Sequence, residues 1–423
     1  MNAPLLRRIK ANELKSVVAP GFDDATVSAA ATIVNDVRRR GESALLEHAA
    51  RLGDWAPGSP WYHDRAALAV AGEALDEPTR SLLIRTAARI ERFATAQRES
   101  LTDISVAVAG GRAGHSVLPM QRAGCYAPAG RFPLVSSLLM TVVTAKAAGV
   151  PEVWVATPRP DGLMLAAAAI AGADGVIGIG GAQGIAALAY GVAPVPPCDI
   201  IVGPGNRWVT AAKKYVAGDV AIDMLAGPSE LVVAADASAD PSIIASDLLA
   251  QAEHDADAIP TLVTTDPSLA DRVERELARQ LEWLPTAATA REALKNGAAI
   301  FCENLDQLVT ACDALAPEHL QLVVQDPSAL AARIRNAGAL FLGERSAEVF
   351  GDYGVGPNHV LPTGRSARYT GGLSVLDFLR VRTWLEIDDP DAVIRDVTAL
   401  ARIEGLAGHA RAAEARASGS PPS

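Results

Sequence analysis

The chain has 423 residues, of which 49% are hydrophobic and 21% charged, a composition typical of a globular protein with more than one domain. Its 38 basic and 49 acidic residues give a net charge of −11, which argues against nucleic acid and anionic membranes as partners. The first residues lack the apolar segment of a secretory signal, and the apolar run at 163–173 is too short to cross a bilayer, so we expect a cytoplasmic protein.

Helical periodicity dominates the front of the chain. Two long patterns, at 24–52 and 76–99, predict a helical N-terminal section, and a β-hairpin with Gly110-Gly111 at its turn is predicted over 106–118. Beyond the hairpin, short β-branched runs alternate with Ala-rich helices. That alternation is typical of parallel βαβ units and predicts an α/β fold.

The alternation falls into two sets. The first predicts strands at 153–156, 175–178 and 199–202 and helices at 135–149, 163–173, 183–190 and 207–217. The second predicts strands at 231–234, 261–265, 298–301, 320–324 and 339–342. A Gly/Pro/Asn-rich loop at 351–363 and a C-terminal helical section at 389–416 follow. Two doubly wound sheets are therefore expected.

Two glycine-rich turns, at 178–183 and 203–206, each follow a predicted strand of the first set. In open parallel sheets ligands bind beyond the carboxyl ends of strands, where glycine lets the backbone approach a phosphate and the next helix offers its N–H groups. Neither turn matches Gly-x-Gly-x-x-Gly. They are either plain tight connections or, because two occupy neighbouring strand ends, a dinucleotide site.

A helix that begins at Asp240-Pro241, with an N-cap and proline at its first position, carries Gln251 and His254 near its end. Three residues apart, their side chains leave neighbouring turns toward the same side. Such a pair is either a surface feature or half of a metal site.

Glu318-His319 follows Ala316-Pro317, and proline disfavours helical geometry in the residue before it, so this pair starts a new element after a turn. An adjacent carboxylate and imidazole provide two proton carriers. The alternative is an exposed pair at a strand start. Asp352 and His359 lie in the glycine-rich loop and, taken alone, are ordinary loop residues.

Glu404 and His409 lie in the C-terminal helical section. Five residues place them about 140° apart around a regular helix, so they cannot serve one ligand unless the helix breaks at Gly405 or Gly408. The four cysteines, Cys125, Cys198, Cys302 and Cys312, show no Cys-x-x-Cys spacing and are expected to be free core thiols.

Taken together, these segments make the chain similar to the histidinol dehydrogenase family from about residue 20 to 410. The motifs that carry the resemblance are CYAPAGR at 125–131, GGAQ at 180–183, VGPGN at 202–206, AGPSE at 226–230, QAEH at 251–254, PEHL at 317–320, and GDY at 351–353 with NHVLPT at 358–363.

The resemblance implies an aldehyde dehydrogenase-like fold with two Rossmann-like doubly wound domains, a helical N-terminal section and a small C-terminal tail domain. The implied domains are an N-terminal arm (1–20), a catalytic zinc domain (21–122 and 231–370), an NAD-binding domain (123–230) and a dimerisation tail (371–423). It also implies an intertwined homodimer that oxidises L-histidinol through the aldehyde to L-histidine and reduces two NAD.

The resemblance further implies a role for each matched residue. Zinc, one per subunit, would be held by Gln251, His254, Asp352 and His409, which would also lie at the substrate together with Ser229, His359 and Glu404. Glu318 and His319 would be the catalytic acid/base residues and would also contact the substrate. Tyr126, Gln183 and Asn206 would contact NAD. Glu404 and His409 would come from the partner subunit.

Two positions depart from the family pattern. Ala129 stands where a second glycine is usual, and Gly354-Val355 replaces the commoner Ala-Ser. Both lie beside expected ligand residues, which leaves open a related NAD-dependent dehydrogenase of another small alcohol, such as a sulfonated diol. Two further alternatives are an aldehyde dehydrogenase that uses Cys125 or Cys302 as its nucleophile and a binding scaffold without activity.

Overall fold

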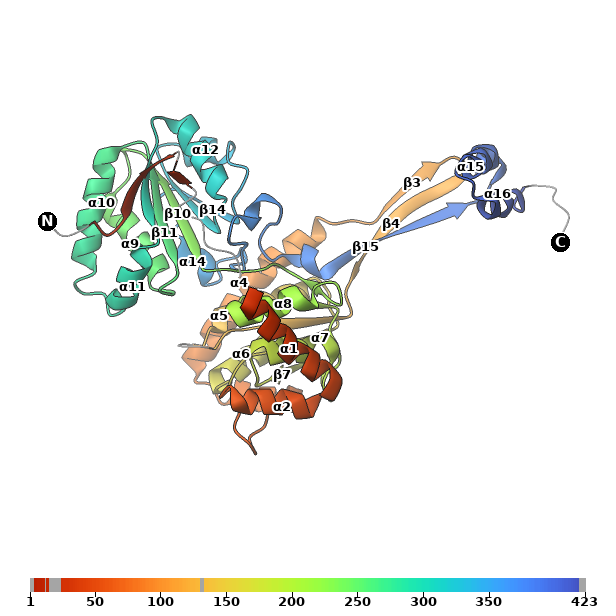
Figure 1. The fold of residues 1–423 in the computed structure, drawn as a ribbon, viewed down its shortest axis with the longest axis horizontal. Helices are drawn as coiled ribbons and strands as arrows, with labels where there is room; N and C mark the ends of the chain where they lie inside the picture. Colours follow the sequence, from red (N-terminus) through yellow and green to blue (C-terminus); the bar gives the residue numbers. More distant parts are fainter. Residues whose placement is uncertain (1–3, 12, 15–23, 130–132, 418–423) are drawn as a thin grey trace. The chain divides into compact units, whose positions relative to one another are not determined.

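The computed structural model describes residues 4–11, 13–14, 24–129 and 133–417. The chain divides into two units, one formed by Met1–Thr95 and Met120–Phe378 and the other by Ala96–Pro119 and Leu379–Ser423. The first unit holds two six-stranded, largely parallel sheets, and the second holds a three-stranded antiparallel sheet. Figure 1 shows the elements of each unit. The predicted α/β fold with two parallel sheets is confirmed.

The first sheet has the strand order β2-β7-β6-β5-β8-β9. Its strands are β2 (Tyr62–Asp64), β5 (Arg122–Tyr126), β6 (Glu152–Ala156), β7 (Gly175–Ile177), β8 (Ile200–Val202) and β9 (Ala221–Ile222). The chain adds β6 and β7 on one side of β5 and then β8 and β9 on the other, so the winding direction reverses between β5 and β8. This is the topological switch point at which doubly wound sheets bind ligands.

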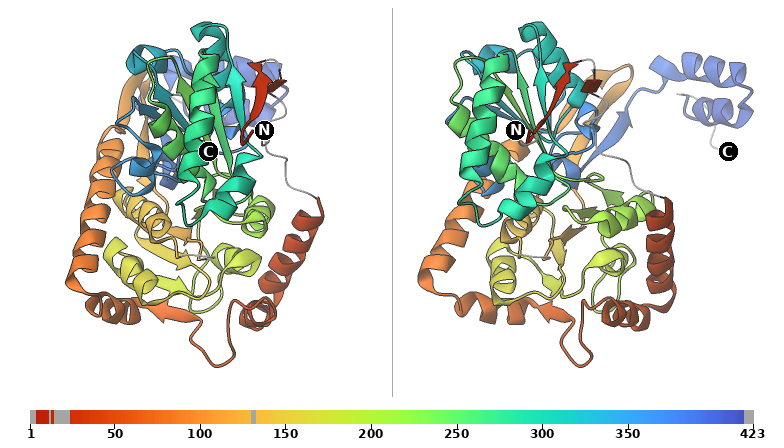
Figure 2. Two further views of the ribbon diagram at one scale, coloured as in Figure 1. Left: turned by 90° about the vertical axis from the view of Figure 1, so that its left-hand side faces the viewer. Right: turned by 60° about the vertical axis from the view of Figure 1, so that its left-hand side comes forward.

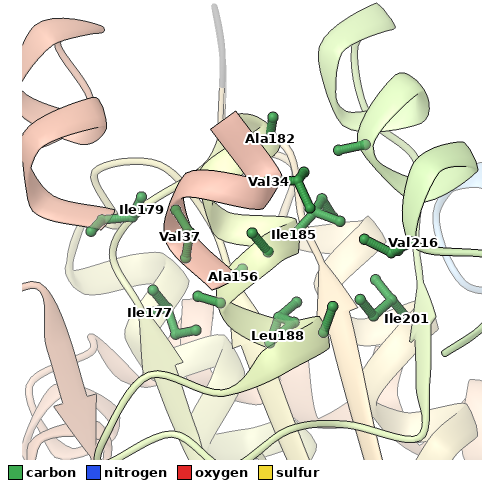
Figure 3. Packing of buried hydrophobic residues seen from close by; sticks show 14 of the residues in the cluster. Val34, Val37, Ala156, Ile177, Ile179, Ala182, Ile185, Leu188, Ile201 and Val216 are labelled. Atoms are coloured by element: carbon green, nitrogen blue, oxygen red, sulfur yellow. The ribbon is translucent and has the colours of Figure 1, made fainter. Parts of the chain in front are cut away.

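Helices cover both faces of the first sheet. They are α5 (Val135–Ala147), α6 (Gly162–Ala171), α7 (Gly181–Tyr190) and α8 (Arg207–Val216). In the N-terminal section, α1 (Asp24–Arg40) and α2 (Glu42–Arg51) pack on α7, and α3 (Arg65–Glu73) packs on α6, whereas α4 (Glu77–Glu99) contacts Gly354. Figure 3 shows Val34 and Val37 of α1 in one apolar cluster with Ile185 and Leu188 of α7. Each such buried side chain contributes about 1.5–3 kcal/mol.

The structure corrects one predicted domain boundary, in the helical N-terminal section. Residues 21–122 were expected with the sheet of 231–370, but α1 packs on α7 and α8, and β2 pairs with β7 of the first sheet. The periodicity of an amphipathic helix predicts that its apolar face is buried, but it does not predict which sheet covers that face. The position of α1 on the first sheet therefore could not be predicted from its periodicity.

The second sheet has the order β1-β12-β11-β10-β13-β14. Its strands are β1 (Arg7–Lys10), β10 (Glu230–Ala235), β11 (Ile259–Thr264), β12 (Ala298–Phe301), β13 (His319–Val323) and β14 (Ala339–Leu342). The described part of the predicted N-terminal arm is thus an edge strand, parallel to β12. Here the winding reverses between β10 and β13.

Side chains of β10 alternate between two apolar layers. Leu231 and Val233 pack with α9 (Pro241–Ala252), α10 (Pro267–Gln280) and α11 (Ala287–Leu294), whereas Val232 and Ala234 pack with α12 (Leu305–Leu315). Figure 2 shows helices on both faces of this sheet. A strand buried on both faces must be a continuous apolar run, as residues 231–235 are.

The second unit joins the hairpin to the C-terminal section. Strand β15 (Leu379–Ile387) pairs with β4 (Gly111–Pro119), which pairs with β3 (Ile104–Val108), followed by α15 (Asp391–Ile403) and α16 (Ala407–Glu414). The predicted hairpin turn is confirmed: Gly110 has φ +79°, and a Cβ there would lie 2.2 Å from the carbonyl oxygen of Asp389. The hairpin therefore belongs with the tail, not with residues 21–95, and the change of unit comes at 379 instead of 371.

In the described parts of the chain, no helix is both long and apolar enough to cross a membrane. The short helix α14 (Glu348–Asp352) follows β14 and packs against α9.

Candidate active site

A cavity of about 190 Å³ lies between the two sheets of the first unit. Pro204 and Gly205, after the carboxyl end of β8, line one side of it, and Ser229, Glu318 and His319, at the amino ends of β10 and β13, line another. The cavity therefore lies beyond the carboxyl ends of strands, where such sheets bind ligands, in the first sheet only. The second sheet faces the cavity with the opposite ends of its strands.

A tight turn places Glu318 at the cavity. Helix α12 ends at Leu315, and Ala316 adopts a left-handed conformation with φ +44°, which is rare for a residue with a Cβ. Pro317 then starts the approach to β13. The predicted turn is confirmed, and the alternative of an exposed pair is wrong, because Glu318 is 8% exposed and His319 is 3% exposed.

Two hydrogen bonds fix the Glu318 carboxylate. Its Oε2 accepts from the hydroxyl of Ser229 at 2.7 Å and from the backbone N–H of Glu230 at 2.8 Å. Burial raises the pKa of Glu318 and outweighs the lowering by His319 and Ser229. A buried carboxyl group with a raised pKa at a cavity is a candidate general acid or base.

One ring nitrogen of His319 is held and the other has no hydrogen-bond partner. Nδ1 lies 3.1 Å from the carbonyl oxygen of Glu230, to which it donates. Nε2 is buried without a partner and lies 3.7 Å from Oδ1 of Asp352. The fixed Nδ1–H leaves Nε2 as the basic atom of a neutral ring.

Charge around His319 controls its protonation. Burial, the largest single influence, lowers the pKa of His319, but the surrounding carboxylates, chiefly Glu318 and Glu348, outweigh it and raise this pKa to about 10. Asp352 responds in the opposite direction. Although burial raises the pKa of Asp352, its contact with His319 brings this pKa below the ordinary value.

A group of nitrogen and oxygen donors surrounds Asp352. Its Oδ2 lies 3.6 Å from Nε2 of His254, and one ligand atom each from His254, Glu348 and Asp352 all lie within 4.8 Å of one another. Helix α9 ends at Ala252, so Gln251 lies in its last turn and His254 just beyond it, not within the helix as predicted. Gln251 is fully buried, and neither its amide nitrogen nor its amide oxygen has a hydrogen-bond partner.

These residues fit a metal ion. Imidazole nitrogen and carboxylate or amide oxygen are donors that zinc accepts, and polar atoms buried without partners are costly unless a ligand satisfies them. The structure brings His254 and Asp352 together, and Gln251 lies in the last turn of α9, which packs against α14. Sequence reasoning missed Glu348. Glu348 lies four residues before Asp352, which puts both side chains on one face of a helix, and this spacing could have indicated that they lie together.

His359 also lines the cavity and is held at both nitrogens. Nδ1 lies 2.8 Å from the carbonyl oxygen of Asp352, to which it donates, and Nε2 accepts from the hydroxyl of Ser137 at 3.1 Å. Burial lowers the pKa of His359, which favours the neutral ring. Asp352 itself is the last residue of α14, not a loop residue as predicted.

The three residues predicted to contact NAD lie at the carboxyl side of the first sheet. Tyr126 ends β5, and its hydroxyl accepts from the N–H of Gly181 at 3.2 Å. Gln183, in the first turn of α7, donates to Asp54 at 2.7 Å. Asn206 caps α8 by accepting from the N–H groups of Trp208 and Val209. Contact with a cofactor stays a prediction for all three.

The turn at 203–206 requires glycine at its start. Gly203 has φ +112°, and a Cβ there would lie 2.1 Å from the carbonyl oxygen of Tyr126. The ends of β5 and β8 therefore approach closely at the switch point. Asp54, from the loop after α2, was not anticipated as a partner of Gln183, because the contact joins residues 129 positions apart.

Glu404 and His409 belong to the second unit, where both are exposed. Helix α15 ends at Ile403, Glu404 is its C-cap, and Gly405 has φ +76°. The break that these two residues need in order to approach one ligand is therefore present at Gly405. Their contact with substrate or metal stays a prediction.

All four cysteines are free and buried, as predicted. Burial raises the pKa of Cys125 to about 12 and that of Cys302 to about 11, so neither is a ready nucleophile. Of the two departures from the family pattern, Gly354 has φ +76°, and a Cβ there would lie 2.6 Å from the side chain of Thr86. Ala129 forms an isolated bridge with Pro133.

Comparison with known proteins identifies the family of this chain. The family model for histidinol dehydrogenase matches residues 21–417. Histidinol dehydrogenase from Thermus thermophilus is 44% identical over 402 residues, covering 93% of this chain and 95% of that protein. Histidinol dehydrogenase from Rhodospirillum rubrum is 45% identical over 397 residues, and the match covers 91% of this chain and 90% of that protein.

A solved structure supports the same assignment. The crystal structure of histidinol dehydrogenase from Elizabethkingia anophelis superposes with a TM-score of 0.91 at 29% identity and covers 98% of this chain and 99% of that one. With the family model matching nearly the whole sequence, this chain belongs to the histidinol dehydrogenase family, a family of oxidoreductases.

Proposed function

We propose that this chain oxidises L-histidinol to L-histidine in two steps at one site, as an enzyme of histidine biosynthesis. In the first step the alcohol loses a hydride to NAD and a proton to the protein, which gives the aldehyde. In the second, water adds to the aldehyde, and the hydrate loses a hydride to a second NAD and its protons to the protein and solvent, which gives the carboxylate. Two NADH form per substrate.

Different residues of the first unit would hold the two cofactors. Gln251, His254 and Asp352, with His409 of the partner subunit, would hold zinc, which when bound would orient the amino alcohol and offset the carboxylate charge that raises the pKa of His319. NAD would accept the hydride from a position at the switch point, near Tyr126, Gln183 and Asn206.

His319 is assigned the alcohol proton. Its Nδ1–H donates to the carbonyl oxygen of Glu230, which holds the ring, its Nε2 is buried without a partner, and the residue lines the cavity. A positioned base of this kind accelerates proton removal by about 10²–10⁴-fold.

Glu318 is assigned the proton of the water that adds to the aldehyde. Its Oε2 is held by Ser229 and Glu230, so the carboxylate is oriented before the water arrives. Burial raises the pKa of Glu318, and a stronger base removes a proton from water more readily. The neutral ring of His359, held by Ser137, would contact the substrate beside it.

We further propose a cytoplasmic homodimer in which Glu404 and His409 reach the site of the partner subunit. Two observations support this proposal. The helix is interrupted at Gly405, so the two residues do not have the spacing of one regular helix, and both side chains are exposed. Exchange of a terminal element between two identical chains is a common way to complete a shared site.

The observation that carries the proposal is the cavity in which a held carboxylate and a held imidazole adjoin a cluster of metal-ligating atoms. The test is the amount of NADH formed from limiting L-histidinol, followed by absorbance to the end point. We expect two NADH per substrate and no accumulation of aldehyde. A ratio of one would exclude the second step, and faster turnover of a sulfonated diol than of histidinol would exclude the proposed substrate.

A further inference from the structure

Glu230, the first residue of β10, contacts both proposed proton carriers through its main chain. Its backbone N–H donates to Oε2 of Glu318 at 2.8 Å, and its carbonyl oxygen lies 3.1 Å from Nδ1 of His319, from which it accepts. The parallel pairing of β10 with β13 brings these groups together. The positions of Glu318 and His319 therefore depend on where the chain holds the start of β10.

The side chain of Glu230 is separate from the candidate active-site cavity. Glu230 is 8% exposed, and it is not among the described residues that line the cavity of about 190 Å³. It lines instead a second cavity of about 20 Å³, together with Thr261 and Arg365. The Glu230 carboxylate is therefore not placed to contact a substrate, and any effect on the reaction must pass through its neighbours.

The Glu230 carboxylate binds the segment that ends the glycine-rich loop. Its Oε1 accepts from the backbone N–H of Gly364 at 3.0 Å. One residue earlier, the hydroxyl of Thr363 accepts from the backbone N–H of Gly227. These two bonds join two segments of the chain that both contribute residues to the lining of the larger cavity. The side chain of Glu230 is thus a tether between them.

The packing of the sheet does not account for a carboxylate at this position. The rest of β10, residues 231–235, is entirely apolar, as expected for a strand buried on both faces. Burial raises the pKa of Glu230 to about 7, although its bond with the Gly364 N–H lowers it, so the buried carboxylate is costly. An apolar side chain would avoid this cost but would leave the Gly364 N–H without its acceptor. The tether accounts for the polar residue.

We propose that Glu230 is a positioning residue, whose side chain fixes the start of β10 against Gly364 and whose main chain thereby holds Glu318 and His319 for proton transfer. This inference rests on the proposed function and adds to it a residue outside the substrate's reach. A displacement of reacting groups by about 1 Å can cost about 100-fold in rate, so a tether that does not contact the substrate can control turnover.

The test compares full-length variants in the presence of zinc, NAD and L-histidinol. Glu230→Ala removes the acceptor for the Gly364 N–H, whereas Glu230→Gln keeps an acceptor oxygen at the same reach without the charge. Asp236→Ala is the matched control, because Asp236 follows the opposite end of β10, about 20 Å along the strand, and its Oδ2 accepts from the backbone N–H of Gln325 at 3.0 Å. It removes a similar tether from the end of the strand remote from the cavity.

We expect Glu230→Ala to lower kcat by about 30–100-fold, with the KM for NAD nearly unchanged, and Glu230→Gln to recover most of that loss. The solvent deuterium isotope effect on kcat should rise in Glu230→Ala, because a misplaced base slows proton transfer relative to the other steps. A variant that is only less stable contains less active enzyme, which lowers the rate but leaves the isotope effect unchanged. Asp236→Ala should keep both the rate and the isotope effect of the wild type.

Glu230→Asp covers the case in which Glu230→Ala does not fold. It keeps the charge, but its carboxylate is one methylene too far from the Gly364 N–H, so it should show the same fall in kcat and the same rise in the isotope effect. An unchanged isotope effect, or a fall in kcat no larger than that of Asp236→Ala, would overturn the role of Glu230 and leave the proposed function intact. If Glu230→Gln recovers nothing, the charge acts and the tether does not. A wild type that does not oxidise L-histidinol would overturn both proposals.

Discussion

The buried ion pair between Lys213 and Asp223 gives the sharpest test of how the first sheet holds its switch-point turn. The two side chains are 2% and 0% exposed. Lys213 also donates to the carbonyl oxygen of Gly203 at 2.9 Å, and Asp223 accepts from the N–H of Gly203 at 2.7 Å. The pair therefore binds both backbone groups of the glycine that opens the 203–206 turn.

Lys213→Met removes the ammonium and leaves the Asp223 carboxylate buried. Breaking a buried pair from one side costs about 3–5 kcal/mol. We take the lower end, about 3 kcal/mol, because Asp223 keeps the N–H donors of Gly203 and Met224. The matched control is Lys295→Met, which breaks an exposed pair with Glu292 and should cost below about 0.5 kcal/mol.

The assay is amide hydrogen exchange of β8 and α8 followed by mass spectrometry, since it reports local opening of this sheet. A loss of about 3 kcal/mol corresponds to exchange about 100-fold faster in Lys213→Met. The KM for NAD should rise as well, with that for histidinol changed less, because the turn lies at the proposed NAD site. Exchange in Lys213→Met as slow as in Lys295→Met would refute the energetic role of the pair.

Two further predictions concern the chemistry. Glu318→Gln should slow oxidation of the aldehyde more than oxidation of the alcohol, because an amide cannot take a proton from water, whereas His319→Asn should slow both. Separate assays with the alcohol and the aldehyde as substrates measure the two rates. If Glu318→Gln slows alcohol oxidation more than aldehyde oxidation, the two roles are exchanged. Cys125→Ser and Cys302→Ser should keep turnover within about three-fold, because burial raises both thiol pKa values, and iodoacetamide should label neither thiol in the folded protein. Loss of activity with zinc still bound would support covalent catalysis.

Much of the fold follows from local sequence. The start of α9 was predicted from Asp240-Pro241, and Asp240 does accept from the N–H of Ser242. The strand at 298–301 was predicted with its observed bounds, because its apolar run is short and bounded. Strand β5 was missed, since Arg122–Tyr126 holds glycine, alanine and cysteine instead of β-branched residues, and only its neighbours make it a strand.

The contacts within the candidate site could not be predicted from local sequence. Glu318 and His319 were expected to start an element after a turn, yet the two hydrogen bonds that fix Glu318 come from Ser229 and Glu230, 89 and 88 positions away. Pairing of β10 with β13 creates these contacts, and strand order is not encoded in either segment alone. Glu348 lies just before the predicted loop at 351–363 and was missed because its proximity to His254 depends on the packing of α14 against α9.

The opposite orientation of the two sheets would suit the two oxidations that we propose for this site. A doubly wound sheet offers glycine turns and helix N-termini at its carboxyl side, as the first sheet does at Gly203 and Asn206, and these suit a dinucleotide. The second sheet faces the cavity with the amino ends of β10 and β13, where strand-start side chains such as Glu318 and His319 are held by backbone groups of the neighbouring strand. If NAD binds at the first sheet as proposed, a spent NADH can leave from one side while the aldehyde stays on the other. A second NAD can then meet the same carbon without a second active site.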